Sequence, residues 1–158
     1  MKTVDVKIKK LHPLTQIPKQ ATEFAGGLDV EARTIIQESE DFVICKLGFA
    51  LEFPVDYKLT LVPRSSLTKT KWVIQNTPCL GDPDFKGEYQ LRFRALPCGI
   101  KVNWKKFKFE LKYPKFPYKT GDRIGQIYLE EIINMSFSEV SELATSVRGD
   151  GGFGSTNK

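Results

Sequence analysis

Tyr57-Lys58-Leu59-Thr60-Leu61-Val62 alternates apolar and polar side chains for most of its length, as a strand with one buried face does. Similar runs recur along the chain, at Val4–Ile8, Phe42–Leu47, Trp72–Ile74, Tyr89–Phe93, Phe107–Leu111 and Ile124–Leu129. They are rich in β-branched and aromatic residues and are separated by Gly, Pro and Asp, whereas the best helical candidate is the short polar stretch Ser65–Lys71. The sequence therefore predicts an all-β sandwich or barrel.

The composition is that of one ordinary globular domain. The chain has 158 residues, of which 41% are hydrophobic and 27% are charged, and this length allows a sizeable core. No apolar run approaches the ~20 residues of a membrane span, and Met1–Lys7 lacks the apolar stretch of a signal peptide. We therefore expect a single cytoplasmic domain over residues 1–158, with no membrane partner.

Cysteine, histidine and charge exclude several kinds of site. Cys45, Cys79 and Cys98 are odd in number and contain no CxxC pair, so the sequence indicates neither a disulfide framework nor a zinc site. The single histidine, His12, excludes a His-rich metal site, and we interpret it as incidental. The net charge of +5 suits a triphosphate, a nucleic acid or plain solubility equally well.

The last eleven residues, Arg148–Lys158, place four glycines around one aromatic ring, Phe153. Glycines let backbone N–H groups approach a phosphate closely, and Arg148, Ser155 and Thr156 add further donors. The segment after about residue 142 also loses strand character. We therefore expect a flexible C-terminal arm over about 142–158 that carries a glycine-rich lid for a nucleoside triphosphate, the alternative being a disordered tail.

Five short motifs occur in order along the chain, and together they carry a family resemblance. They are Ala25–Ala32, Pro63–Leu67, Asn76–Glu88, Gly121–Gln126 and the C-terminal tail. With these motifs the chain resembles the trimeric dUTPase family, which hydrolyses dUTP to dUMP and pyrophosphate. The resemblance implies a distorted jelly-roll or β-barrel domain, a homotrimer with nucleotide sites between subunits, and a tail that crosses to a neighbouring subunit's site.

Two residues are the candidates for catalysis. Asp82 stands in the turn-rich segment Gly81–Asp84, where a carboxylate can lie at the edge of a cleft, or can simply form an Asx turn at a hairpin tip. By resemblance, Asp82 is the base that activates a water for attack on the α-phosphate. Gln126 is expected on a strand; by resemblance its amide orients that water, and the alternative is a solvent-facing polar residue.

Phosphate binding is expected from the second and first motifs. Arg64, Ser65 and Ser66 open the short predicted helix, and free N–H groups at a helix start suit a phosphate, although a plain serine N-cap explains the serines too. By resemblance Arg64 and Ser65 contact the phosphates, while the family usually has glycine at the place of Ser66. Asp29 is expected near the metal-bound triphosphate by the same resemblance. Asp122 and Arg123 look structural, in a turn or at a subunit contact.

Base and sugar recognition are assigned to the third motif and the tail. A hairpin from Asn76 to Phe85 can present backbone groups to a uracil edge, with Asn76 among the substrate-binding residues. The family usually has tyrosine at the place of Phe85, whose ring packs on the deoxyribose. We expect exclusion of ribose to persist because it is mainly steric; the alternative for Phe85 is an ordinary core residue.

The tail completes this assignment. By resemblance Phe153 stacks over the uracil, and Arg148, Gly154, Ser155 and Thr156 reach the phosphates. The chemistry implies Mg²⁺ as cofactor, held mainly by phosphate oxygens and waters, so we expect no direct protein ligands to the metal.

The segment from about 99 to 119 departs most from the family. It is rich in lysine and aromatic residues, and its length predicts a basic insertion. It suits a solvated hairpin, a protein-binding surface or, less well, a single-stranded nucleic-acid platform.

Two other functions stay open. A dCTP deaminase of the same fold needs a glutamate on the strand after the third motif, where this chain has Arg92, and this argues against deamination. A dCTP-directed pyrophosphatase is not excluded. A regulatory protein that acts through the basic insertion is the alternative from another class.

Overall fold

The computed structural model describes residues 3–104 and 107–151, and these residues are almost entirely strand, turn and loop. Their strands are β1 (Lys7–Lys10), β2 (Lys19–Gln20), β3 (Leu28–Glu31), β4 (Thr34–Ser39), β5 (Phe42–Lys46), β6 (Phe49–Glu52), β7 (Tyr57–Pro63), β8 (Trp72–Ile74), β9 (Cys79–Gly81), β10 (Gln90–Ala95), β11 (Gly99–Asn103), β12 (Lys108–Lys112) and β13 (Arg123–Glu131). One 3₁₀-helix, η1 (Ser65–Lys69), lies between β7 and β8. The prediction of an all-β domain is confirmed.

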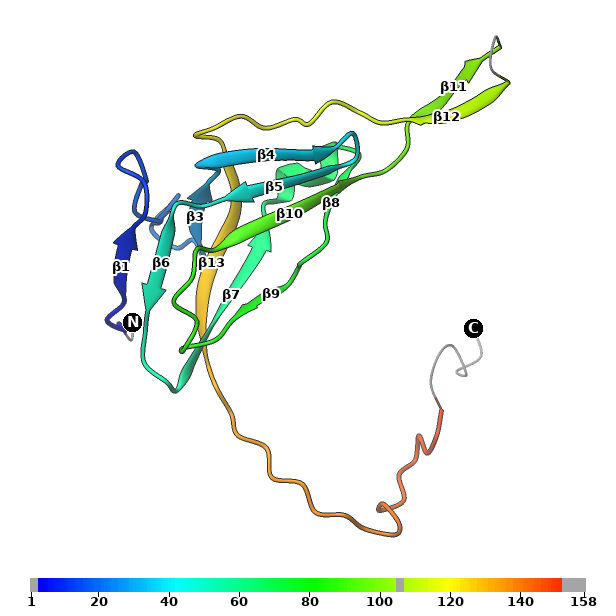
Figure 1. The fold of residues 1–158 in the computed structure, drawn as a ribbon. Helices are drawn as coiled ribbons and strands as arrows, with labels where there is room; N and C mark the ends of the chain where they lie inside the picture. Colours follow the sequence, from blue (N-terminus) through cyan, green and yellow to red (C-terminus); the bar gives the residue numbers. More distant parts are fainter. Residues whose placement is uncertain (1–2, 105–106, 152–158) are drawn as a thin grey trace.

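Two antiparallel sheets form the body, one ordered β2-β3-β13-β7-β9 and the other β4-β5-β10-β8, with β1 and β6 paired beside them (Figure 1). Their inward side chains make one hydrophobic core, in which Leu61 comes from the first sheet and Phe93 from the second. Both are fully buried. The alternation along β7 and β10 thus gives each strand one core face, because successive side chains point to opposite faces.

Most strands expected from alternation are present, but several others carry no such pattern. β6 is buried at Phe49, Ala50 and Leu51 in succession, so its sequence shows no alternation. β4 is largely exposed, and β9 and β2 are only 3 and 2 residues long. β1 begins at Lys7, three residues later than the strand predicted from Val4. The stretch predicted to be helical forms a 3₁₀-helix that ends at Lys69.

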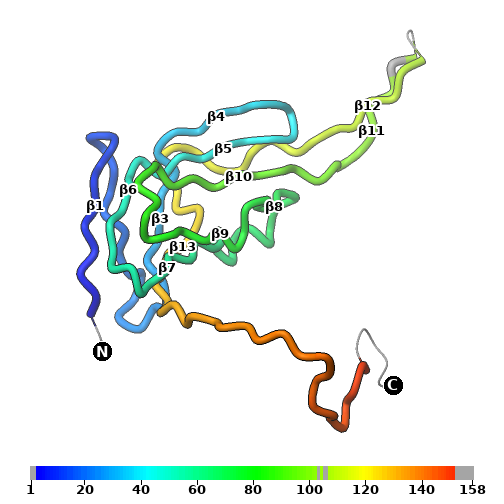
Figure 2. Tube along the Cα trace, turned by 60° about the horizontal axis from the view of Figure 1, so that its bottom comes forward, coloured from blue at the N-terminus to red at the C-terminus, as the bar shows by residue number. Residues whose placement is uncertain are grey.

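Two segments leave the body. The β11–β12 hairpin projects beyond the sheets, and the chain after β13 runs away from them as an extended arm (Figures 1 and 2). Ile132 still donates its N–H to the Asp56 carbonyl at 2.7 Å, whereas most side chains from there to Asp150 are exposed. The arm therefore leaves the sheet at about residue 132, ten residues earlier than the sequence pattern indicates. Among the described residues, no helix is long and apolar enough to cross a membrane.

The three cysteines are free thiols in different surroundings. Cys45 is buried, Cys79 is partly buried and Cys98 is exposed. Burial raises the pKa of the Cys45 thiol to about 12, so this residue packs as a small apolar side chain and does not ionise at neutral pH.

Candidate functional site

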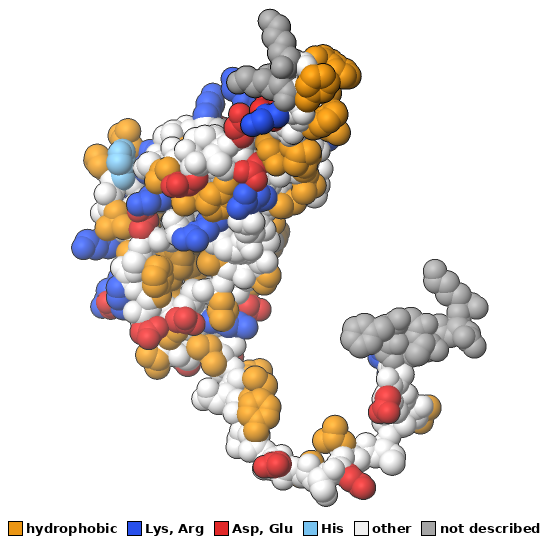
Figure 3. All heavy atoms as spheres, turned by 45° about the vertical axis from the view of Figure 1, so that its right-hand side comes forward, with side chains coloured by type: hydrophobic (Ala, Val, Ile, Leu, Met, Phe, Trp, Pro, Cys, Tyr) orange, Lys and Arg blue, Asp and Glu red, His pale blue; other side chains and the backbone are white. Residues whose placement is uncertain are grey.

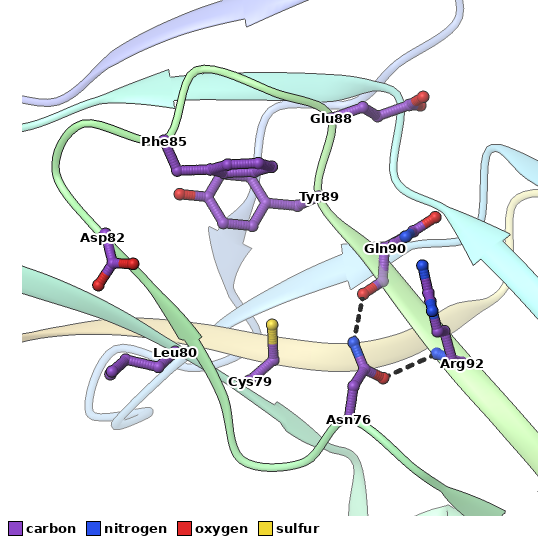
Figure 4. A pocket seen from close by; sticks show the side chains of 9 residues that line it. All are labelled: Asn76, Cys79, Leu80, Asp82, Phe85, Glu88, Tyr89, Gln90 and Arg92. Atoms are coloured by element: carbon purple, nitrogen blue, oxygen red, sulfur yellow. Dashed lines mark hydrogen bonds between the residues drawn. The ribbon is translucent and has the colours of Figure 1, made fainter.

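A pocket of about 280 Å³ opens between the loop that follows β9 and the start of β10 (Figure 4). Its lining residues come from the third sequence motif and the adjoining strand; they are Asn76, Cys79, Leu80, Asp82, Phe85, Glu88, Tyr89, Gln90 and Arg92. Three predicted site residues, Asn76, Asp82 and Phe85, thus share one cavity.

Asp82 begins a tight turn at the rim of this pocket. The Phe85 N–H donates to the Asp82 carbonyl at 3.1 Å, which closes the turn through the backbone. No donor among the described residues bonds the Asp82 carboxylate, so its side chain forms no Asx turn within this part of the chain. An exposed carboxylate without a partner is available to accept a proton from a bound water.

Asn76 closes the base of the pocket by bonding to β10. Its amide nitrogen donates to the Gln90 carbonyl at 3.0 Å, and its amide oxygen accepts from the Arg92 N–H at 2.8 Å. Both interactions appear as dashed lines in Figure 4. They tie the hairpin that precedes Asp82 to the second sheet, so Asn76 shapes the cavity wall whatever else it contacts.

Two aromatic rings stack at the other wall. Phe85 is 43% exposed, and its ring meets that of Tyr89 edge to face, with centroids 5.2 Å apart. Tyr89 is only 3% exposed. Phe85 therefore forms a partly exposed portion of the pocket wall and is not an ordinary core residue.

A second cluster surrounds the buried carboxylate of Asp29 on β3. Arg123 Nη1 lies 2.8 Å from Asp29 Oδ2, and Arg64 Nε lies 3.2 Å from Asp29 Oδ1. Gln126 Nε2 also donates to Oδ1, at 3.1 Å. The register of the first sheet explains the meeting, because Gln126 on β13 pairs directly with Asp29 while Arg64 follows β7.

This cluster has the charge and the oriented amide that suit an anion. Two guanidinium groups share one carboxylate, so the cluster keeps a net positive charge that attracts phosphate. Because Gln126 directs its amide nitrogen to Asp29, its amide oxygen is the group turned to other partners. Arg123, which the sequence analysis assigned to structure, takes part in this cluster together with the predicted residues.

The neighbouring turns have different roles. Asp122 accepts from the Lys119 N–H through its carboxylate at 2.8 Å, so it shapes the turn before β13 as expected. Arg64 occupies the N-cap position of η1 and makes no side-chain cap hydrogen bond, so neither serine is the N-cap. Ser65 is exposed and Ser66 half-buried at the start of this 3₁₀-helix, beside Arg64.

The pocket and the Asp29 cluster lie toward opposite ends of β7. On one side of β7, Leu59 pairs with Gly81, the residue before Asp82; on the other side, Val62 pairs with Gln126. Three residues of strand measure roughly 10 Å, and the two flanking strands are about 10 Å apart across β7. Asp82 and Gln126 of one chain are therefore much too far apart to act on the same water.

The tail residues fall largely outside the described part. Arg148 donates from Nε to the Gly151 carbonyl at 2.6 Å in a local turn. Phe153, Gly154, Ser155 and Thr156 lie outside the described residues. The structure thus brings together Asn76, Asp82 and Phe85 at one place and Asp29, Arg64 and Gln126 at another.

Metal-binding groups do not gather in the described part of the chain. No three His, Cys, Asp or Glu side chains there are close enough to hold a metal ion. The Asp29 carboxylate is already engaged by two arginines and an amide.

The chain is similar to proteins of one class, the nucleotide-hydrolysing dUTPases. A sequence model of that family, described as dUTPase, matches residues 107–157. The deoxyuridine 5'-triphosphate nucleotidohydrolase of Helicobacter hepaticus is 34% identical over 158 residues, covering 99% of this chain and 90% of that protein. The protein of the same name from Fusobacterium nucleatum is 32% identical over 162 residues, and the alignment covers 100% of this chain and 100% of that protein. The chain belongs to the dUTPase family.

A solved structure shows the same fold. Staphylococcus bacteriophage 80alpha dUTPase, solved with dUPNHPP, superposes with a TM-score of 0.76 at 21% identity, covering 98% of this chain and 99% of that one. The dUTPase of phage phi11 of S. aureus, studied for the coordination of a structural Mg(II) ion, has a TM-score of 0.67 at 18% identity and covers 89% of this chain and 99% of that chain.

Proposed function

We propose that this protein is an enzyme that hydrolyses dUTP to dUMP and pyrophosphate. The observation that carries the proposal is the Asp82 carboxylate, which has no donor within residues 3–104 and 107–151, at the rim of a pocket of about 280 Å³ that Phe85 also lines. Curated relatives named deoxyuridine 5'-triphosphate nucleotidohydrolase, at 32–34% identity over nearly the whole chain, support the substrate.

The reaction is a single displacement at the α-phosphorus. Asp82 accepts a proton from a water whose oxygen attacks that atom, and the bond from the α-phosphorus to the bridging oxygen breaks as pyrophosphate leaves. The Gln126 amide oxygen accepts the water's second hydrogen and so orients its lone pair. Arg64, supported by Asp29 and joined by Ser65 and Ser66, balances the charge of the phosphates.

We further propose a homotrimer in which neighbouring chains complete each other's sites. The separation of Asp82 from Gln126 across β7 supports this, because one reaction needs both groups at the same water. The arm supports it too: Ile133, Met135 and Phe137 alternate and are each at least 76% exposed. An apolar pocket of about 210 Å³ on the body, lined by Ile8, Leu51 and other aliphatic residues, suits the arm of a second copy.

The C-terminal tail then acts as a lid on a neighbour's site. In this proposal Phe153 covers the uracil, and Arg148, Gly154, Ser155 and Thr156 contact the phosphates. Within the described residues the arm extends away from its own body, so it is free to reach another chain (Figure 1).

Magnesium fits this site as a companion of the substrate. Asp29 is fully engaged by Arg64, Arg123 and Gln126, so oxygen ligands would come from the phosphates and water, with no direct protein ligand. Bound Mg²⁺ would neutralise phosphate charge and orient the triphosphate chain.

Product analysis tests the proposal directly. The protein is mixed with dUTP, dCTP and UTP separately, each with Mg²⁺, and the products are separated by chromatography. We expect dUMP and pyrophosphate from dUTP alone. Conversion of dCTP to dCMP would indicate the dCTP-directed pyrophosphatase, release of ammonia would indicate a deaminase, and no turnover at all would contradict an enzymatic role.

A second function, protein binding through the segment 99–119, is favoured by the β11–β12 hairpin. Its cross-strand pairs place Ile100 against Leu111 and Val102 against Phe109 on one face. All four side chains are exposed, and apolar side chains gather at the projecting hairpin (Figure 3). The segment also carries seven lysines and one glutamate, so a protein segment with acidic and apolar residues would fit better than a neutral one.

Replacing the four hairpin residues Ile100, Val102, Phe109 and Leu111 by serine tests this second function. Peptides are selected on the wild-type protein and counter-selected on the serine variant. Enrichment of acidic sequences with alternating apolar residues supports protein binding. A fall in trimer mass or melting temperature in the variant would instead show that the hairpin packs on a neighbouring copy, and failure to enrich any peptide would contradict a protein partner.

A further inference from the structure

Tyr89 carries a buried hydroxyl that its surroundings leave unused. Its oxygen is inaccessible to solvent and has no hydrogen-bond partner among the described residues. A buried donor without a partner destabilises the fold, and phenylalanine would fill the same space without that cost. A hydroxyl in such a place calls for a partner that the isolated chain does not bring to it.

The position of this hydroxyl links it to Asp82. A side-chain carbon at Gly81 would lie 2.8 Å from both the Tyr89 hydroxyl oxygen and its Cε1 atom. The tip of Tyr89 thus occupies the space beside the residue that precedes Asp82. Figure 4 shows the hydroxyl directed to the Asp82 side of the pocket, beneath the Phe85 ring.

The donor is held rigidly, whereas the acceptor stands on a loop. The Tyr89 N–H donates to the Phe49 carbonyl at 3.2 Å, and its carbonyl accepts from the Leu47 N–H at 3.0 Å. Its ring also packs against Phe49 and Phe85. Asp82, by contrast, lies in an exposed turn closed by one backbone hydrogen bond from Phe85. A rearrangement of this turn can therefore bring the carboxylate to a fixed hydroxyl.

We propose that Tyr89 is a positioning residue for the catalytic base, its hydroxyl donating a hydrogen bond to the Asp82 carboxylate when nucleotide fills the pocket. One carboxylate oxygen is then held against the pocket wall, and the other faces the attacking water. The inference rests on the proposed hydrolysis of dUTP. The contact between the Phe85 and Tyr89 rings can link nucleotide binding to the position of Tyr89. A sugar that packs on the Phe85 ring also pushes that ring against Tyr89.

The ionisation of Tyr89 agrees with a donor role. Burial above all, followed by Coulombic repulsion from Cys79 and Asp82, raises its pKa to about 12. The hydroxyl therefore keeps its proton across the pH range in which a dUTPase can be assayed.

The test compares Tyr89→Phe with Tyr118→Phe. Tyr118 is a matched control, because its hydroxyl is also buried without a partner among the described residues, yet it packs on Phe93 and Phe116 away from the pocket. We expect Tyr89→Phe to lower kcat about tenfold, the size of effect expected from losing one hydrogen bond to a charged group, with KM for dUTP unchanged and a melting temperature that does not fall. Tyr118→Phe should leave kcat and KM as in the wild type and should not lower the melting temperature either.

The pH profile separates positioning from packing. A donor favours the charged form of a carboxylate, so its loss raises the pKa of the base. The acid limb of kcat should therefore move to higher pH in Tyr89→Phe and stay in place in Tyr118→Phe. In an Asp82→Asn background, Tyr89→Phe should cost no further turnover, because the coupled group is already gone.

Two outcomes overturn the inference and leave the proposed function standing. One is a Tyr89→Phe enzyme with the kcat and acid limb of the wild type; the other is an equal loss in Tyr118→Phe, which would indicate a general packing effect. A wild-type protein with no dUTP turnover overturns the proposed function and this inference together, whereas an active wild type with an unaltered Tyr89→Phe variant overturns only the role of Tyr89.

Discussion

Asp82 and Asp29 are the same residue type in opposite surroundings. Asp82 is exposed at a pocket rim and has no donor among the described residues, whereas Asp29 is buried and holds two arginines and an amide. An unpaired carboxylate can take up a proton, while a carboxylate shared by two guanidinium groups is committed to holding them in place. The difference between the two carboxylates therefore suits Asp82 to proton transfer and Asp29 to holding the arginines in position.

Removing the charge at Asp82 should give the largest effect on turnover. Asp82→Asn keeps the shape of the side chain but cannot accept the proton from water, so we expect kcat to fall by about 10³-fold or more. Binding of a non-hydrolysable dUTP analogue, measured by calorimetry, should change little. Asp84→Asn, in the same turn, is the control, and equal losses in both variants would contradict the assignment of the base.

Loss of the tail should come next. A chain that ends at residue 147 lacks Arg148, Phe153 and the glycine-rich lid, but every strand of the body remains. We expect kcat/KM for dUTP to fall by about 10²-fold, from lost positioning of the phosphates, with an unchanged melting temperature. A truncated protein that melts many degrees lower would show that the tail serves folding, and full activity would show that the lid is dispensable.

The sequence predicted the strands whose apolar and polar side chains alternate. It did not predict which residues of different strands lie in contact. β10 has one buried face, and β7 has its apolar residues on one face although Thr60 on the other face is also buried, so their patterns were informative. In β6 three apolar residues in succession are buried, so the strand shows no alternation. The motifs located Asp82, Gln126 and Arg64 through a family resemblance.

The pairing of Arg123 with Asp29 follows from the β3–β13 register, and a single sequence does not reveal such a register. The sequence did not reveal a role for Tyr89 either. It stands two residues before Leu91, so in the alternating pattern of β10 it looks like another aromatic residue of the core. What distinguishes it is a hydroxyl that lies against Gly81 and has no partner in the described part of the chain, and this depends on how the loop after β9 folds back.

The comparison of the two aspartates also has a stability side. Asp29→Ala would leave Arg64 and Arg123 facing each other without their shared carboxylate, so we expect a loss of about 2 kcal/mol in the free energy of unfolding, less than for a fully buried pair because both arginines reach solvent. Asp82→Ala, which breaks no hydrogen bond or ion pair of its carboxylate with the described residues, should be nearly neutral. Urea denaturation of both variants measures the contrast, and equal values would mean that the Asp29 cluster contributes nothing to the fold.

The smallest expected effect is that of Phe85→Tyr. The ring packs edge to face on Tyr89 with centroids 5.2 Å apart, and its tip approaches Gly87 so closely that a side-chain carbon there would lie 2.6 Å away. If the ring excludes ribose by its bulk, the added hydroxyl brings no new discrimination, because the surface that a 2′-hydroxyl would strike is already present. We therefore expect kcat/KM for dUTP to stay within about threefold and the preference for dUTP over UTP to persist in both proteins. The opposite result would be a wild type that hydrolyses UTP and dUTP at equal rates and a Phe85→Tyr variant that prefers dUTP. It would show that the tyrosine hydroxyl, through hydrogen bonding, excludes ribose, and that the bulk of the ring does not.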